Sequence, residues 1–253
     1  MIAIAAIFRN EAPYLKEWIE FHLKVGFERF FLFNNLSTDD FQSVLKPYKD
    51  LIELTHWPLE HSNIVEWNEI QCLAYERAIH KAQKYKWLAL LDIDEFLFSP
   101  VSKTLPPILD RFEHAGGIGV NWQLFGTSCV PQIDPNQRLI EALTYRFPKD
   151  LGVNHHVKPI VRPDRVLICE SPHFAIYKEP FRQLTTNGIP FEGPISPTIC
   201  TELLRINHYV LRDLNYFSNQ KTARLSKWWG QSIDWQEKYR EKNQEEDRTI
   251  LQL

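Results

Sequence analysis

The sequence has few cysteines, no long apolar run and no excess of positive charge, and each absence excludes a class of protein. Its four cysteines lie far apart and form no C-x-x-C pair, which argues against a zinc site or a disulfide framework and favours reduced thiols. No uncharged apolar run approaches the roughly 20 residues that a membrane helix needs. The formal net charge of −3 gives no basic field that would attract nucleic acid.

The N-terminus also lacks a targeting signal, because the apolar residues 1–8 follow no basic segment and are too few for a signal peptide. We therefore expect a cytoplasmic protein, with at most peripheral contact at the inner face of a membrane. No repeat or low-complexity linker interrupts the 253 residues, of which 44% are hydrophobic, as is typical of soluble globular proteins. The sequence predicts a single domain over residues 1–253.

The first hundred residues alternate between short apolar segments and amphipathic segments. Predicted strands cover residues 2–8, 29–34, 51–57 and 87–91. Predicted helices cover residues 11–26, 41–49 and 68–85. Strands that alternate with helices favour right-handed βαβ units and a mostly parallel sheet. The second half is less regular, with short predicted strands at 117–122 and 159–163 and a polar C-terminal helix over about 231–253.

Three of the predicted strands run directly into polar residues. These are Arg9, Asn10 and Glu11 after the first strand, Asn34 and Asn35 after the second, and Asp92 and Asp94 after the fourth. In open α/β sheets ligands bind beyond the carboxyl ends of the strands. We therefore expect the three groups to gather at one edge of the sheet and to form a binding site.

The segment WLALLDIDEFL places Asp92, Asp94 and Glu95 within four residues. Carboxylates this close repel one another, so a cationic group is expected to offset the repulsion. A turn at the end of the strand would let Asp92 and Asp94 converge on Mg²⁺ or Mn²⁺, which commonly joins one or two carboxylates to phosphate oxygens. The alternative is a solvated strand end, or an acid that caps a following helix.

Two classes of enzyme carry D-x-D after an apolar strand. In phosphatases of the haloacid dehalogenase type the first Asp is the nucleophile, and the motif usually lies on the first strand and continues D-x-D-x-[TV]. In nucleotide-sugar glycosyltransferases the motif follows several βα units that hold the nucleoside. Here the motif reads D-I-D-E-F and begins at Asp92, which favours the glycosyltransferase.

The chain resembles the family 2-like glycosyltransferases related to glycosyltransferase family 92. The matching segments occur in family order between residues 2 and 230 and include RNEAPYLKEWIEFHLKVGFERFFLFNNLSTDD, WLALLDIDEFL, VNWQLFGTS, HVKPIVRP and LRINHYVLRDLNYF. The resemblance implies a GT-A fold, which is a Rossmann-like nucleotide-sugar-binding fold with a mixed, mostly parallel sheet. It also implies Mn²⁺ or Mg²⁺ as cofactor, a nucleotide-binding half at about 1–100 and an acceptor and catalytic half at about 101–230.

The resemblance implies donor-binding roles for residues of the first half. Glu11 matches the acid of an N-E motif beside the nucleoside, and Arg9 and Asn10 belong to the same segment. Asn35 stands where related enzymes carry an Asp that reads the uracil edge, which leaves the identity of the base open. Gln71 matches a residue that faces the donor.

The resemblance also implies a metal site made of three residues. Asp92 would approach the ribose and the metal, and Asp94 would ligate the metal. His208 in RINHYVLR is placed as a third ligand, because imidazole binds Mn²⁺-like ions. Its alternative role is that of a core histidine bonded to a backbone carbonyl.

Basic residues of the second half are candidates for binding the diphosphate. Lys158 in HVKPIVRP could bind a diphosphate oxygen as a point charge, unless it is merely solvated. His173 matches the family as well and is structural or functional. Lys221 and Arg224 share one helix face and could clamp phosphates, although a solvated basic face is the simpler interpretation.

Transfer with inversion requires a base that takes the proton of the acceptor hydroxyl. Glu141 in RLIEALTYRF matches an acid of a family segment and is our candidate, with Glu95 as its competitor. The resemblance favours a UDP-hexose donor such as UDP-galactose, inversion, and a glycan, glycolipid or lipopolysaccharide-type acceptor. The alternatives are the phosphatase and a catalytically dead nucleotide- or sugar-binding protein, although a dead site would not need Asp92, Asp94 and His208.

Overall fold

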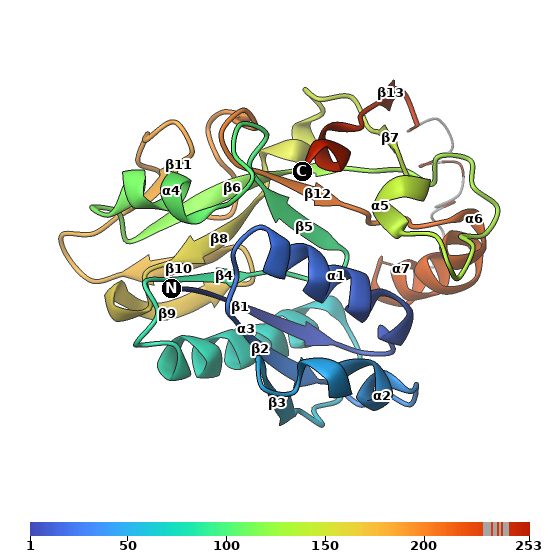
Figure 1. The fold of residues 1–253 in the computed structure, drawn as a ribbon, viewed down its shortest axis with the longest axis horizontal. Helices are drawn as coiled ribbons and strands as arrows, with labels where there is room; N and C mark the ends of the chain where they lie inside the picture. Colours follow the sequence, from blue (N-terminus) through green and yellow to red (C-terminus); the bar gives the residue numbers. More distant parts are fainter. Residues whose placement is uncertain (230–233, 235–236, 238, 240–242) are drawn as a thin grey trace.

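The computed structural model describes residues 1–253 except 230–233, 235–236, 238 and 240–242. Within the described residues, nine strands form one curved sheet in the order β3-β2-β1-β4-β8-β6-β12-β5, with β11 paired to β6 (Figure 1). The strands of this sheet are β1 (Ile2–Phe8), β2 (Arg29–Asn34), β3 (Ile52–His56), β4 (Trp87–Leu90), β5 (Glu95–Phe98), β6 (Gly117–Leu124), β8 (Val157–Val161), β11 (Gln183–Thr185) and β12 (Arg205–His208).

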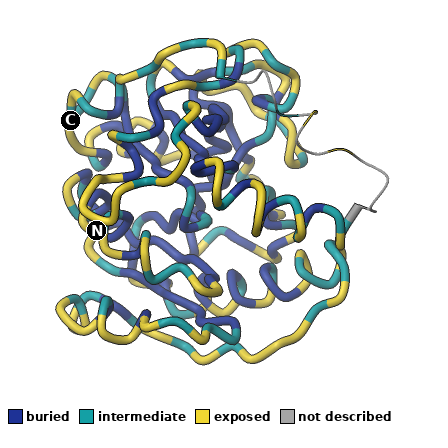
Figure 2. The backbone as a smooth tube through the Cα atoms, turned by 90° about the vertical axis from the view of Figure 1, so that its right-hand side faces the viewer, coloured by how far each residue is buried: buried dark blue, intermediate teal, exposed yellow. Residues whose placement is uncertain are grey.

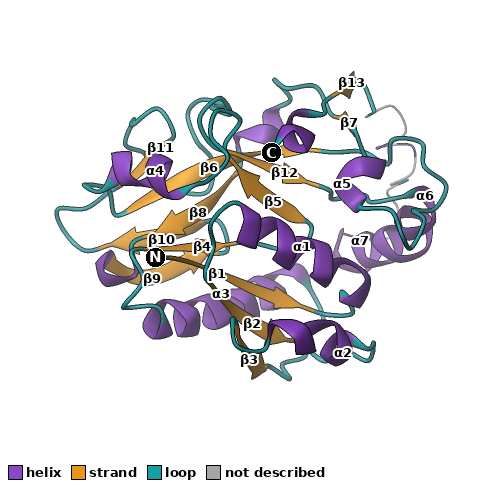
Figure 3. Cartoon of the chain, in the orientation of Figure 1, coloured by secondary structure: helices purple, strands orange, loops and turns teal. Residues whose placement is uncertain are grey.

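Two small two-stranded sheets and seven α-helices complete the described part of the chain. The small sheets pair β9 (Val166–Ser171) with β10 (Phe174–Tyr177), and β7 (Tyr145–Arg146) with β13 (Glu245–Glu246). The helices, drawn purple in Figure 3, are α1 (Ala12–Lys24), α2 (Phe41–Leu45), α3 (Ile64–Lys81), α4 (Pro106–Leu109), α5 (Leu139–Ala142), α6 (Leu214–Tyr216) and α7 (Thr222–Trp229).

The predicted α/β class with a mixed, mostly parallel sheet is confirmed. In the described sheet five strand pairings are parallel and three are antiparallel. The parallel pairs β3-β2-β1-β4 come from the first hundred residues, where strands and helices alternate as predicted. Two antiparallel pairs, β4–β8 and β5–β12, join this half to the second half, and the third, β6–β8, lies within the second half.

The strand β1 is apolar throughout because the sheet is covered on both faces. Its residues Ile2, Ile4, Ala6 and Phe8 join a core cluster that includes side chains of α1. The alternate residues of β1 join a second cluster with α3 and the β9–β10 pair. Figure 2 shows this buried interior in dark blue, with exposed loops around it.

The helix α3 begins at Ile64, four residues before its predicted start at residue 68. Asn63 caps it, because the Asn63 side chain accepts a hydrogen bond from the Glu66 backbone N–H. The Glu66 carboxylate in turn accepts the backbone N–H of Ser62, which completes a reciprocal cap. This cap lies in a polar stretch that the apolar spacing did not reveal.

The predicted C-terminal helix over about 231–253 is wrong for its last part, residues 243–253, whereas the described residues Glu237 and Tyr239 are helical. Residues 243–253 form β13 and a short 3₁₀ turn at Thr249–Gln252, while most of 231–242 lies outside the described residues. Asp247 accepts hydrogen bonds from Arg205 at 2.8 and 3.0 Å, which ties this segment to β12. A tertiary ion pair therefore decides the backbone here. In the part of the chain that is described, no helix has the length and apolar character needed to cross a bilayer.

His22 couples α1 to β5 in the core. Its Nδ1–H donates to the Trp18 carbonyl at 2.8 Å, and its Nε2 accepts the Leu97 backbone N–H at 3.3 Å. Only the neutral ring, with a proton on Nδ1 and none on Nε2, can make both of these hydrogen bonds. Complete burial lowers the pKa of His22 from 6.5 to about 3, against a smaller opposite effect of the Trp18 hydrogen bond.

This arrangement predicts acid destabilisation through His22. Its folded pKa lies below its unfolded pKa, so only the unfolded state takes up the proton between pH 6.5 and pH 3, and stability is lost as pH falls through this window. We expect His22 to cost about 2 kcal/mol of unfolding free energy between pH 7.5 and pH 5. Urea titrations at both pH values measure the loss.

The His22→Gln variant should be less stable at pH 7.5, and its stability should change less between the two pH values than that of the wild type. His114→Gln, at an exposed histidine, is the matched control and should keep the wild-type pH dependence. An unchanged pH dependence in His22→Gln would show that another group carries the acid sensitivity.

Candidate active site

A cavity of about 230 Å³ lies beyond the carboxyl ends of β1 and β4, and we call it the inner cavity. The polar groups that follow β1 and β4 meet there as predicted, with side chains from α3, β12 and α7 on the other walls. The charged and histidine residues that line it are Arg9, Glu11, Asp92, Asp94, His173, His208, Lys221 and Arg224. Two of the three polar groups that the sequence places at this edge therefore meet at the cavity, whereas Asn34 and Asn35 do not line it.

The acidic cluster is held by a buried lysine. The Lys158 Nζ, on β8, lies 3.1 Å from Asp92 Oδ2 and 3.7 Å from Glu95 Oε2. Lys158 and Glu95 are completely buried, whereas the Asp92 side chain keeps 34% exposure. The cation that was expected to offset the repulsion between the carboxylates is therefore a residue of the protein itself.

Burial and charge act against each other in this cluster. Burial lowers the pKa of Lys158, but the carboxylates of Asp92 and Glu95 outweigh it and hold the pKa well above its usual value. Burial raises the pKa of Glu95 to about 7, although Lys158 opposes the rise. One ammonium thus serves two carboxylates, of which only Asp92 reaches the cavity.

A tight turn at residues 92–95 sets the direction of these side chains. The Glu95 backbone N–H donates to the Asp92 carbonyl at 3.2 Å, and the Asp92 N–H donates to Glu95 Oε2 at 2.9 Å. On the α3 side, Gln71 Nε2 donates to Asp92 Oδ1 at 2.6 Å. Tyr75 Oη donates to the same oxygen at 3.3 Å. Asp92 is therefore held from both sides, and Gln71 also lines the inner cavity.

Asp94 and His208 face each other across β5 and β12. His208 stands opposite Glu95 in the antiparallel register, and its Nε2 lies 3.6 Å from Asp94 Oδ1. Its Nδ1 lies 3.6 Å from Glu95 Oε1, and neither of these two buried atoms has a hydrogen-bond partner. Burial raises the pKa of Asp94, but attraction to His208, Arg212 and Lys221 outweighs this and holds it well below its usual value.

The predicted three-residue metal set is only partly assembled. Among the described residues, no group of three His, Cys, Asp or Glu side chains is arranged to hold a metal ion. Asp92 is turned toward Lys158, so Asp94 and His208 remain. Ligand atoms lie roughly 2.0–2.2 Å from such ions, so two of them are about 3–4 Å apart. The separation of 3.6 Å between Asp94 Oδ1 and His208 Nε2 fits shared ligation of one ion.

The other predicted donor residues of the first half differ in their placement. Glu11 lines the cavity, but its carboxylate pairs with the buried Arg212 at 2.5 Å. Arg9 lines the cavity without a carboxylate partner among the described residues. Asn10 adopts a φ of 56°, and its Oδ1 accepts the Thr38 backbone N–H at 2.7 Å. It therefore joins the loop after β1 to the loop after β2.

Two predicted donor contacts are wrong as direct contacts. Asn35 is completely buried. Its side-chain amide donates hydrogen bonds to the backbone carbonyls of Trp57 and Leu59 at 2.9 and 2.7 Å. It organises the loop after β3 and does not line the cavity. Lys158 lies beneath Asp92 rather than at the surface of the cavity, so it neutralises carboxylates and is not placed to touch a diphosphate.

The structure does not support either predicted base. Glu141 lies on α5, exposed to solvent and paired with Arg138 at 2.5 Å, and it does not line the inner cavity. The sequence around Glu141 does not distinguish an acidic residue on a short surface helix from a catalytic acidic residue. Glu95 is next to the metal pair but fully buried, so it positions Asp92 and Lys158 instead of meeting a substrate.

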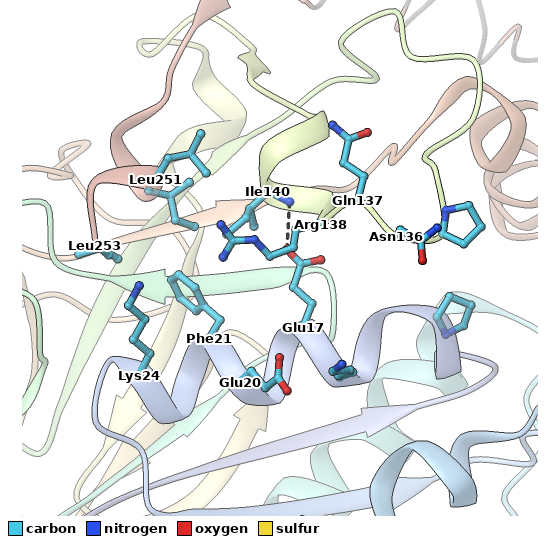
Figure 4. A pocket seen from close by; sticks show the side chains of 14 residues that line it. Glu17, Glu20, Phe21, Lys24, Asn136, Gln137, Arg138, Ile140, Leu251 and Leu253 are labelled. Carbon is cyan, nitrogen blue, oxygen red and sulfur yellow. Dashed lines mark hydrogen bonds between the residues drawn. The ribbon is translucent and has the colours of Figure 1, made fainter. Parts of the chain in front are cut away.

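Another cavity, of about 430 Å³, lies between α1 and the segment around α5 (Figure 4). Its acids already have structural tasks. The Glu17 carboxylate accepts the backbone N–H groups of Leu139 and Ile140, and Glu20 accepts the hydroxyl of Tyr48. We therefore regard the smaller inner cavity as the site, because its charges are convergent and partly unpaired.

Sequence reasoning missed or undervalued several residues of the inner cavity. Lys221 is buried at the end of a π-helical turn, Phe217–Lys221, and is not the solvated base that seemed simplest. Burial lowers its pKa to about 7, with a further contribution from Arg224. The i, i+3 spacing of Lys221 and Arg224 was the available signal.

Trp122 and His173 form a fixed aromatic wall of the cavity. The Trp122 indole donates to the Val153 carbonyl at 2.9 Å and has ring contacts with His173 at 5.4 Å and His208 at 4.9 Å. His173 Nδ1 donates to the Val157 carbonyl at 2.9 Å. Burial lowers the pKa of His173 to about 3, so its ring is neutral and Nε2 remains an acceptor.

Comparison with known proteins assigns the family. The sequence model of the family described as glycosyltransferase family 92 matches residues 1–251 of this chain. This chain belongs to glycosyltransferase family 92. The resemblance read from the sequence is confirmed, and membership supports a glycosyltransferase rather than a phosphatase of the haloacid dehalogenase type.

Three plant members of family 92 are similar along 93% of this chain. The rice protein Os08g0121900 is 26% identical over 246 residues, and the Ricinus communis protein RCOM_0530710 is also 26% identical over 246 residues. The Arabidopsis thaliana protein At1g27200 is 22% identical over 251 residues. The chain spans 37–39% of the length of these relatives.

Solved structures are more distant from this family 92 chain. Staphylococcus aureus TarS in complex with UDP is 14% identical with a TM-score of 0.41, over 64% of this chain and 46% of TarS. The galactosyltransferase LgtC in complex with donor and acceptor sugar analogues is 13% identical with a TM-score of 0.31, over 99% of this chain and 69% of LgtC. The family assignment therefore rests on the sequence match and not on these structures.

The buried cluster predicts a large stability cost when its cation is removed. Lys158→Met should lower the unfolding free energy by roughly 3–5 kcal/mol, because Asp92 and Glu95 would lose their shared partner. Adding Glu95→Gln should restore part of this loss, since the amide oxygen can still accept the Asp92 N–H. Urea unfolding of the two variants and of the control Lys103→Met measures both effects.

Lys103 is exposed, so its replacement should leave the unfolding free energy within about 0.5 kcal/mol of the wild type. A Lys158→Met protein as stable as this control would mean that the acids of the cluster need no internal cation. Additive costs in the double variant would mean that Lys158 and Glu95 do not interact.

Proposed function

We propose that this family 92 domain transfers a hexose from a nucleoside-diphosphate sugar to a hydroxyl of an acceptor. One observation carries the proposal, namely that the Asp94–His208 pair and the cations Lys221 and Arg224 line the same small cavity. A leaving diphosphate needs positive charge at the reacting centre. Lys221 and Arg224 would supply it from one side of the cavity, and a divalent ion held by Asp94 and His208 would supply it from the other. Family membership supports the same class of reaction.

The cations of the cavity are suited to bind the phosphate oxygens. Lys221 on the π-helical turn and Arg224 on α7 have no carboxylate partner among the described residues, and Arg9 adds a third cation. Diphosphate oxygens near Lys221 would favour its protonated form, because they offset the burial that lowers its pKa. Binding and charge stabilisation thus use the same groups.

The neighbouring carboxylate is suited to bind the sugar of the nucleoside. Asp92 Oδ1 is oriented by Gln71 and Tyr75, and its exposed part faces the cavity. Hydroxyl groups of a ribose are donors that an oriented carboxylate can accept. Lys158 and Glu95 would hold Asp92 in this orientation without touching the donor.

Asp94 and His208 are the residues that would hold Mn²⁺ or Mg²⁺. Their atoms are spaced for shared ligation, and phosphate oxygens commonly complete the coordination of such ions. A bound divalent ion would supply further positive charge for the leaving diphosphate. The imidazole of His208 favours Mn²⁺ over Mg²⁺.

The finer features of the proposal rest on the resemblance to family 92 and its relatives. They are a UDP-hexose donor such as UDP-galactose, inversion at the anomeric carbon, and a glycan, glycolipid or lipopolysaccharide-type acceptor. The relatives are more than twice as long as this chain, so these features are proposed for the domain alone. The convergence of Asp92, Asp94 and His208 on one cavity argues against a dead binding protein.

The metal pair gives the first test. UDP should raise the melting temperature of the wild type much more with Mn²⁺ than with EDTA, because ligand at a hundredfold excess over its Kd contributes about 2.7 kcal/mol. Asp94→Asn should lose the Mn²⁺-dependent part of the shift while keeping the shape of the side chain. Thermal unfolding with and without UDP measures both.

Asp110→Asn, at an exposed acid that does not line the inner cavity, serves as the matched control and should behave as the wild type. If UDP binds equally well in EDTA and in Mn²⁺, the metal part of the proposal is wrong. If Asp94→Asn keeps the full Mn²⁺-dependent shift, the ligand assignment is wrong.

Glu141 gives a test of the corrected site. Because it lies outside the cavity and is bound to Arg138, Glu141→Gln should release UDP from UDP-galactose at the wild-type rate within about twofold. His208→Gln should slow the same release by roughly 10²-fold or more, as expected when an electrostatic group of the site is lost. A large loss in Glu141→Gln would return that residue to the role of base.

A further inference from the structure

Two cysteines that are far apart in the sequence lie next to each other in the folded protein. Cys72 lies on α3 and Cys169 on β9, and these two elements pack directly against each other. The Cys169 backbone N–H donates to Glu76 Oε1 at 3.3 Å, and Glu76 follows Cys72 by one helical turn. Residues i and i+4 share one face of a helix, so the face of α3 that binds Cys169 also carries Cys72. The two thiols are hydrogen-bonded to each other.

The two thiols differ in their access to solvent. Cys169 is 4% exposed and belongs to the second core cluster. Cys72 is half-buried and packs against this cluster from the outside. A reagent in solution therefore meets Cys72 first, with Cys169 directly beneath it.

The contact between the thiols prepares Cys72 to act as a nucleophile. The hydrogen bond with Cys169 is the largest influence on the pKa of Cys72 and lowers it, although burial opposes this effect. The same hydrogen bond, together with burial, raises the pKa of Cys169. The thiolate is the attacking form in thiol–disulfide exchange. Cys72 is therefore suited to react first, and Cys169 to react second.

The other two cysteines have different neighbours. Cys129 is exposed, and its sulfur lies 3.6 Å from Asn243 Nδ2. Cys200 is buried, and its sulfur lies 3.0 Å from Asn187 Nδ2 and 3.1 Å from Thr198 Oγ1. All four cysteines are free thiols, so Cys129 offers an unpaired thiol for comparison within the same chain.

We propose that Cys72 and Cys169 are a redox-sensitive thiol pair, which forms a reversible disulfide between α3 and β9 when it reacts with a small-molecule disulfide. This inference goes beyond the proposed function and does not depend on it. The expectation of reduced thiols describes one state of the pair, and the disulfide is the other.

The reaction consists of two exchange steps. The Cys72 thiolate attacks one sulfur of the small disulfide, whose S–S bond breaks and releases the first half as a thiolate. Cys169 then gives up its proton and attacks the Cys72 sulfur, which releases the second half as a thiolate. The two protein thiols are oxidised to one disulfide, and the small disulfide is reduced to two thiols, which take up the two protons.

The second step becomes easier once the first has occurred. The hydrogen bond with Cys72 is the largest cause of the raised pKa of Cys169, and it is lost when Cys72 carries half of the reagent. The new bond would close a loop of about 100 residues. It would also tie α3, whose Gln71 and Tyr75 hold Asp92, to β9.

The experiment treats the folded full chain with hydroxyethyl disulfide and maps the products by mass spectrometry of peptides. Cys72 and Cys169 should be joined to each other in the wild type. Exposed Cys129 should carry the hydroxyethyl group, which shows that the reagent has acted. Dithiothreitol should restore all four thiols.

Variants separate the two steps. Cys169→Ala should leave the hydroxyethyl group on Cys72, because the second thiol is missing. Cys72→Ser should leave Cys169 reduced, because Cys169 is buried. Cys129→Ser is the matched control and should form the disulfide at the wild-type rate.

Urea unfolding of Cys129→Ser tests whether the fold accommodates the bond. This variant avoids the adduct on Cys129, and its oxidised form should unfold at a urea concentration about 1 M higher than its reduced form. An unchanged or lower midpoint would overturn the proposal, because the bond would then strain the folded state. A stable hydroxyethyl group on Cys72 in the wild type would overturn it as well, and so would modification of Cys129 while Cys72 and Cys169 stay reduced.

Discussion

The buried ammonium of Lys158 is the interaction on which the rest of the site depends. It places one positive charge between Asp92 and Glu95, at 3.1 and 3.7 Å, in the fully buried interior. Without it, the turn at residues 92–95 would bring three carboxylates together with no internal compensation. Because β8 supplies the lysine and β4 leads into the acids, the antiparallel pairing of these strands joins the two halves of the chain at the site.

The same constraint divides the acids by function. Glu95 is fully buried and accepts the Asp92 backbone N–H, and Asp92 is oriented by Gln71 and Tyr75. His208 lies 3.6 Å from both Asp94 and Glu95, and of these two acids only Asp94 lines the cavity. The three neighbouring acids Asp92, Asp94 and Glu95 therefore have different surroundings in the folded protein. Lys221 of the π-helical turn and Arg224 of α7 close the cavity from the other side, so that opposite charges face each other across a space of about 230 Å³. Charge that is arranged before the substrate arrives needs little reorganisation during the reaction.

Much of the fold could be predicted from the spacing of apolar residues along the sequence, because this spacing reflects which side chains of a strand or helix are buried. The unbroken apolar run of β1 indicated a strand covered on both faces, and α1 and α3 provide the two covers. Asp94 and His208 were paired in advance through the family resemblance, and the register of β5 against β12 brings them together. By contrast, the acid of Glu141 matched a family segment yet sits on a surface helix, since a motif fixes residue types but not the direction in which a side chain points.

The sequence by itself determined the order of βα units, the edge of the sheet where polar residues gather, and the family. The tertiary structure alone decided which charges are paired and which are free. Lys158 became a buried counter-ion, Asn35 became a loop brace, and Lys221 and Arg224 became walls of the cavity. The physical reason is that local spacing governs backbone conformation, whereas the partner of a charge is set by strands and helices distant in sequence. The C-terminal segment shows the same division, because its pairing of Asp247 with Arg205 overrides its helical pattern.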